Sequence, residues 1–137
     1  MAEPKGWDWL DAQKRGESEY SGVREAIEEE FALLSEATKA QIETILRAME
    51  LSELVSFEYD GLDRVVAPFV IGLSSEGNPL VRGYQTEGVS KSGRGPGWRV
   101  FQVEKMGEVT RYFEYFDIEQ FEFDHDYPWI YKVFRTL

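Results

Sequence analysis

The chain has 137 residues, a formal net charge of −11 and no cysteine. The lack of cysteine excludes a disulfide framework, thiol catalysis and thiolate metal sites. The acidic balance argues against broad, non-specific nucleic-acid binding. Hydrophobic residues make up 42% and aromatic residues 15% of the chain, which is enough for the core of one folded domain.

Targeting signals are not evident in the sequence. No apolar run approaches the length of about 18 residues that a membrane span needs. The opening segment "MAEPKGWDWLDAQKRG" lacks the apolar stretch of a secretory signal. We therefore expect a soluble, cytoplasmic protein that does not associate with a membrane.

Residues 1–20 are predicted to form an irregular N-terminal arm. Trp7, Trp9 and Leu10 are its only large apolar residues before Tyr20. Two interpretations follow: these side chains dock onto the body of the protein, or they contact a partner.

Residues 21–52 are predicted to form an acidic helical segment, as one long helix or as two short ones. Glu28–Glu30 lie off the apolar stripe, which is typical of a solvated helix face, and Ser35 or Thr38 is the candidate N-cap of a second helix. Apolar residues recur mostly at steps of three and four and form one stripe: Ile27, Phe31, Leu34, Ile42, Ile45, Leu46 and Met49.

Residues 53–123 change to the two-residue period of β-strands. Asp60-Gly61 is a strong signal for a hairpin turn. Pro68 predicts that its strand either lies at an edge or bends there. Strands at roughly ten-residue spacing favour a small antiparallel barrel or sandwich. The predicted strands are 55–59, 65–71, 80–85, 98–103, 109–116 and 121–123, with a loop over 86–96.

Residues 124–137 are predicted to form a C-terminal tail with a short helix. Asp126 is the candidate N-cap of this helix, and Pro128 lies in its first turn.

Three sequence blocks resemble the WYL domain, a small SH3- or Sm-like β-barrel found in bacterial regulators and phage-defence proteins. The blocks are "LVSFEYDGLDRVVAPF" (Leu54–Phe69), "GNPLVRGYQ" (Gly77–Gln85) and "WRVFQVEKMGEV" (Trp98–Val109). The chain is most similar to short, stand-alone versions without a helix-turn-helix. The Trp-Tyr-Leu signature itself is absent here. The resemblance spans about residues 41–112 and implies an α+β fold, with the helical segment packed on an SH3/Sm-like barrel.

A set of basic residues is the candidate source of a ligand site: Arg64, Arg82, Lys91, Arg94, Arg99 and Lys105. Arg82 and Arg99, on adjacent predicted strands, are expected to converge on one anion, because Arg offers bidentate hydrogen bonds to phosphate or carboxylate. Arg94 lies in a glycine-rich loop, Glu87–Gly97, which is expected to act as a mobile flap over that face. Lys105 matches a basic position of the WYL pattern and completes the set.

Ordinary salt bridges are the alternative role for these cations. In that interpretation, Arg99 and Lys105 pair with Glu58 or Glu104, which is plausible in a chain with 26 acidic residues. The loop sequence "SGRGPG" lacks the Gly-Lys-Ser/Thr ending of a P-loop.

Aromatic residues on the predicted strands have two possible roles. Tyr84 and Trp98 are candidates for stacking on a nucleobase, whereas Phe57 and Phe101 are interpreted as core. His125, the only histidine, is flanked by aspartates, and we interpret it as structural or exposed. No recognisable catalytic set is present.

The sequence therefore predicts a non-enzymatic, regulatory module without a cofactor. Its expected ligand is a small anionic or nucleotide-like molecule, or a short single strand of nucleic acid, held by Arg82, Tyr84, Arg94, Trp98, Arg99 and Lys105. The alternative is an acidic phage or bacterial interaction protein, which binds a basic protein such as a nucleic-acid enzyme through its acidic helix. The oligomeric state is left open.

Overall fold

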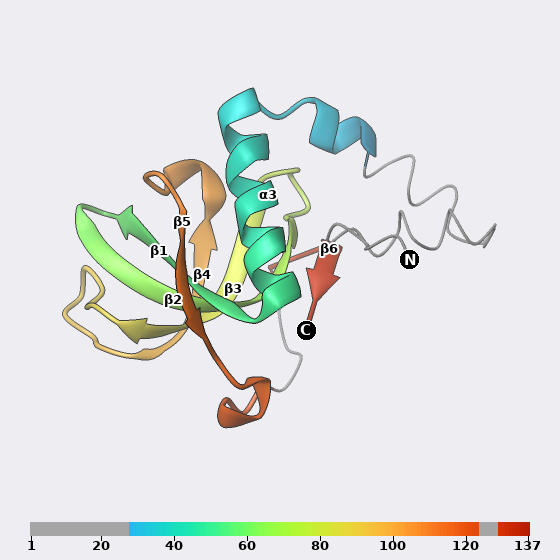
Figure 1. The fold of residues 1–137 in the computed structure, drawn as a ribbon. Coiled ribbons are helices and arrows are strands. Elements are labelled where there is room, and N and C mark those ends of the chain that lie inside the picture. Colours follow the sequence, from blue (N-terminus) through green and yellow to red (C-terminus); the bar gives the residue numbers. More distant parts are fainter. Residues whose placement is uncertain (1–27, 124–128) are drawn as a thin grey trace.

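A computed structural model describes residues 28–123 and 129–137 of the chain. Within these residues, helix α3 (Glu36–Leu51) packs against an antiparallel sheet (Figure 1). The predicted α+β fold class is confirmed. The N-terminal arm with Trp7, Trp9 and Leu10 lies outside the described residues, as do Ile27 and His125.

The helical segment is divided in two. Residues 28–32 are helical, residues 33–35 are not, and α3 then begins at Glu36. The Ser35 hydroxyl accepts a hydrogen bond from the Thr38 backbone N–H at 3.1 Å, so Ser35 rather than Thr38 is the N-cap. The predicted apolar stripe is confirmed for Ile42, Ile45, Leu46 and Met49, which α3 buries against the sheet.

Six strands form the sheet. Their order is β4-β3-β2-β1-β5, with β6 paired to β2 outside this path. Because β4 and β5 are the two ends of this path, strand pairing does not close the sheet into the predicted SH3/Sm-like barrel. No strand forms over 121–123. The strands are β1 (Glu53–Tyr59), β2 (Leu62–Leu73), β3 (Pro79–Glu87), β4 (Gly97–Gln102), β5 (Thr110–Tyr115) and β6 (Lys132–Thr136), with 3-10 turns η2 (Val103–Lys105) and η3 (Ile118–Gln120).

Local sequence signals account for the hairpin turn and the bend at the centre of the sheet. Asp60 (φ 54°) and Gly61 (φ 76°) both have positive φ, as a type I′ hairpin turn requires, and they connect β1 to β2 as predicted. Strand β2 is central, and its register with β3 shifts between Pro68 and Val70. Pro68 therefore marks a bend, and the edge-strand interpretation was wrong.

Both faces of the sheet carry an apolar cluster. The inner cluster lies beneath α3 and includes Val55, Phe57, Val66, Val81 and Phe101 together with the buried helix residues. The outer cluster lies on the opposite face and is built on Val65, Ala67, Phe69, Val70 and Leu80, with Phe116, Phe121, Phe123 and Ile130 packed on it. The segment that follows β5 therefore covers the outer face of the sheet.

The C-terminal tail differs from the prediction. Asp126 and Pro128 lie outside the described residues, but 132–136 form strand β6 and not a helix. Strand β6 pairs with the last part of β2, where Gly72 lies opposite Val133. The side chain of Phe134 is 1% exposed and belongs to the inner cluster. Burial of this alternating segment outweighs the local helix signals.

Gly72 is the residue that allows β6 to approach β2. A Cβ atom at this position would lie 2.2 Å from the Lys132 carbonyl oxygen. Gly72→Ala is therefore expected to separate the two strands and to lower the free energy of unfolding by about 1–3 kcal/mol or more. Gly95→Ala is the matched control, because nothing lies within 4 Å of that position. Chemical denaturation checks both variants, and equal midpoints for them would contradict the role of Gly72.

Candidate functional site

Arg82 and Arg99 do not converge on one anion. In the β3–β4 register, Arg82 lies opposite Val100, and Arg99 lies opposite Gly83. Adjacent strand residues point to opposite faces, so this offset places Arg82 on the outer face and Arg99 on the inner face. The predicted convergence was wrong, because the register places the two arginine side chains on opposite faces of the sheet.

The structure brings together Arg82, Tyr84 and Trp98 on the outer face. The Arg82 guanidinium carbon lies 5.2 Å from the centre of the Trp98 ring. The Tyr84 ring lies 4.8 Å from Phe121, and the Trp98 ring lies 5.1 Å from Phe123. Tyr84 and Trp98 are thus partly buried members of the outer cluster, and not free stacking surfaces.

Carbonyl oxygens, rather than carboxylates, are the partners of Arg99. Its guanidinium donates hydrogen bonds to the carbonyl oxygens of Trp98, at 3.0 Å, and of Gly95. Within residues 28–123 and 129–137, neither Arg99 nor Lys105 forms an ion pair. The salt-bridge interpretation with Glu58 or Glu104 is therefore wrong for the described residues.

Arg64 is the deeply buried cation on the inner face. Its side chain is 3% exposed and donates to the Gln85 side-chain oxygen and to the Tyr59 carbonyl oxygen, both at 3.1 Å. The nearest paired carboxylate is that of Asp60, at 4.0 Å. Among the described residues, the Arg64 Nε and the Gln85 Nε2 have no hydrogen-bond partner although both atoms are buried.

Arg64 and Arg99 both lie on the inner face, and Arg94 lies in the loop that precedes β4. We call Arg64, Arg94 and Arg99 the guanidinium cluster. Burial lowers the pKa of Arg99, and repulsion from Arg94 and then from Arg64 lowers it further. Arg94 and Arg64 therefore lie close enough to repel the charge of Arg99, while Arg64 also shares a hollow with Glu58, Asp63 and Glu108.

Arg94, the third member of the cluster, lies in the loop between β3 and β4. The Arg94 backbone N–H donates to the Ser90 hydroxyl at 3.1 Å, and the Ser90 N–H donates to the Arg94 carbonyl at 2.7 Å. Arg94 is exposed. Lys105 is also exposed, in η2. That this loop acts as a mobile flap stays a prediction.

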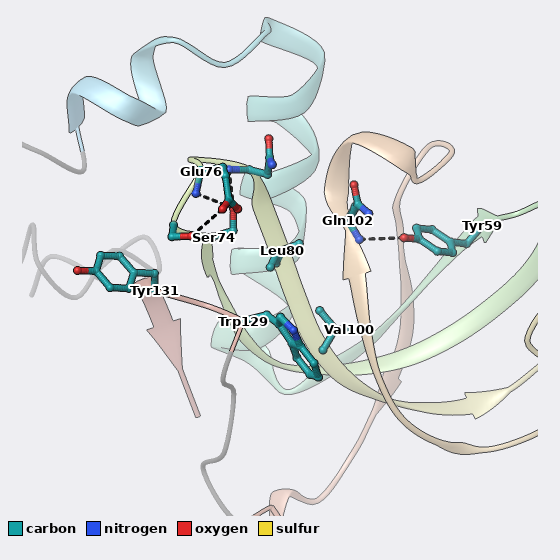
Figure 2. A pocket seen from close by; sticks show the side chains of 10 residues that line it. Tyr59, Ser74, Glu76, Leu80, Val100, Gln102, Trp129 and Tyr131 are labelled. Carbon is teal, nitrogen blue, oxygen red and sulfur yellow. Dashed lines mark hydrogen bonds between the residues drawn. The ribbon is translucent and has the colours of Figure 1, made fainter.

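A second candidate site is an aromatic pocket of about 570 Å³. Figure 2 shows Trp129 beside Val100 and Leu80, with the turn 74–78 and Tyr131 at one side and Tyr59 at the other. The remaining lining residues are polar or acidic: Ser74, Ser75, Glu76, Asn78 and Gln102.

Sequence reasoning did not place Gln85, Trp129 or Tyr131 in a site. The Trp129-Ile130-Tyr131 alternation was a usable signal, because it puts both rings on one side of an extended chain. Gln85 gave no signal by itself, since its role depends on the hydrogen bond that it accepts from the buried Arg64. Arg64 was included in the basic set from the sequence. Its burial was not predicted, because it depends on the β1–β2 register.

The described residues contain neither a metal-type cluster of side chains nor a membrane-spanning helix. No group of three His, Asp or Glu side chains in 28–123 and 129–137 is arranged to hold a metal ion. None of the helices in these ranges is long and apolar enough to span a membrane.

Comparison of the chain with known proteins identifies no relative. No family model, no curated protein and no solved structure matches it.

Proposed function

We propose that the protein is a non-enzymatic module that binds a small anionic ligand, such as a phosphate-bearing nucleotide, at the guanidinium cluster. One observation carries this proposal: Arg64 is 3% exposed and its nearest paired carboxylate is 4.0 Å away, while Arg94 and Arg99 add like charge. Buried cations are normally paired. An anion bound here supplies negative charge beside Arg64 and reduces the repulsion between the three guanidinium groups.

The donors around the cluster suit an oxyanion. Arg groups form bidentate hydrogen bonds to phosphate or carboxylate oxygens. Arg94 is exposed and Arg99 is partly buried, so an anion reaches them from solvent. Arg82 is excluded from this site, because it lies on the outer face.

A WYL-like domain remains our proposal for the fold family, with a sheet that strand pairing leaves open between β4 and β5. Two features support it besides the three sequence blocks. Helix α3 immediately precedes β1. The Gln102 backbone N–H donates to the Tyr59 hydroxyl at 3.0 Å, which connects β4 to β1 although these strands are not neighbours in the sheet.

Thermal unfolding with inorganic phosphate, pyrophosphate and a panel of nucleotides tests the function, with chloride at equal ionic strength as the reference. A ligand at 100 times its dissociation constant raises stability by about 2.7 kcal/mol. We expect Arg99→Met to abolish this gain with little net change in the stability of the free protein, because the relief of like-charge repulsion offsets the loss of two hydrogen bonds to carbonyl oxygens.

Arg82→Met is the matched control on the opposite face, and it should keep the full response. The proposal fails if no anion raises the melting temperature above the chloride reference, or if Arg99→Met responds as the wild type does.

A further inference from the structure

The aromatic pocket has the opposite charge character from the guanidinium cluster. None of its ten lining residues is basic, and Glu76 supplies one carboxylate. Trp129 and Tyr131 are 63% and 73% exposed. Aromatic faces attract cations through the negative charge of the ring face, and the carboxylate adds to that attraction.

Backbone pairing places the chain that carries Tyr131 beside the end of β2. The Tyr131 N–H donates to the Leu73 carbonyl at 2.8 Å, and Lys132 pairs with Leu73 in the β2–β6 ladder. Trp129 and Tyr131 are therefore held beside the end of β2, next to the turn that carries Glu76 (Figure 2).

The turn 74–78 is built by its own hydrogen bonds. The Ser74 hydroxyl accepts from the backbone N–H of Asn78, at 3.1 Å, and of Glu76, at 3.3 Å. The Ser75 hydroxyl donates to the Glu76 carboxylate at 2.9 Å. These contacts orient an exposed carboxylate, and among the described residues Glu76 forms no ion pair.

We propose that this aromatic pocket docks a short extended segment of a partner protein through one Arg or Lys side chain. The volume of about 570 Å³ exceeds what a single side chain fills, and exposed Trp and Tyr residues are typical anchors of protein interfaces. The net charge of −11 favours a basic partner. Arg82 pairs with Val100, which lines the pocket, but its guanidinium lies over Trp98, two same-face rows away from Leu80 and Gln102.

The test uses the full-length protein and three peptides: acetyl-Gly-Gly-Arg-Gly-Gly-amide and the same peptide with Glu or norleucine in place of Arg. Two-dimensional NMR follows the Trp129 indole N–H and the amides of 75–78, with Trp129→Phe used for assignment. We expect the Arg peptide to shift these signals, the norleucine peptide to shift them less, and the Glu peptide to leave them unchanged.

Single variants separate the contribution of the Trp129 ring to peptide binding from that of the Glu76 carboxylate. Trp129→Ala should weaken binding of the Arg peptide about tenfold, and Glu76→Gln about threefold. Arg99→Met should leave this binding unchanged, so failure here and failure at the guanidinium cluster are distinguishable. Equal shifts with the Arg and Glu peptides, or no shift with millimolar Arg peptide, would overturn the proposal.

Discussion

Arg111→Met is expected to lower the free energy of unfolding by about 3–5 kcal/mol. The Arg111 Nε donates to the Glu53 carboxylate at 2.6 Å, and Glu53 is 1% exposed. This hydrogen bond raises the pKa of Arg111 above its usual value. Removal of the arginine leaves a buried carboxylate without its partner, which is more costly than the loss of a surface pair. Urea denaturation at neutral pH measures the effect.

Two control variants test whether the loss of stability comes from the unpaired, buried Glu53 carboxylate. Lys39→Met breaks a pair in which Glu36 is 91% exposed, and it should cost less than about 1 kcal/mol. The double variant Glu53→Leu with Arg111→Met removes both charges and should recover most of the loss, since replacing a buried pair by apolar residues is often neutral. A loss of under 1 kcal/mol for Arg111→Met would contradict the account.

Phe69→Ala is expected to lower the free energy of unfolding by about 3–5 kcal/mol. Phe69 is fully buried in the outer cluster. Its ring centre lies 5.0 Å from those of Trp98 and Phe123 and 5.6 Å from that of Phe116. Truncation therefore removes the ring on which the segment after β5 packs, and guanidinium chloride denaturation measures the loss.

Phe113→Ala is the matched control for this core substitution. Phe113 is 70% exposed, on β5, so its loss should stay within about 1 kcal/mol. Similar losses for Phe69→Ala and Phe113→Ala would mean that the outer cluster does not stabilise the fold.

Local sequence signals predicted much of the fold correctly. The Asp60-Gly61 turn and the Ser35 cap depend on the conformational and hydrogen-bonding properties of a few adjacent residues, so a single sequence is enough to find them. The α+β class followed from the change of period near Leu54. The C-terminal strand was missed, because β6 depends on pairing with β2, about 60 residues earlier in the chain.

The candidate site was less predictable for the same reason. Whether Arg82 and Arg99 share a face is decided by the β3–β4 register, and a shift of one residue reverses the answer. Arg94 and Arg99 both belong to the predicted basic set. Their interaction with Arg64 depends on the pairing of β1 to β4, which no local pattern reveals.

The most direct test of the guanidinium cluster is NMR of the arginine Nε–H groups during titration with pyrophosphate. Each Nε–H signal reports on the surroundings of one guanidinium, and those of Arg64, Arg99 and the control Arg82 all have no hydrogen-bond partner among the described residues. We expect saturable shifts at Arg64, Arg94 and Arg99, and none at Arg82 on the opposite face. Shifts confined to Arg82, or no saturable shift at any arginine, would contradict the proposed anion site.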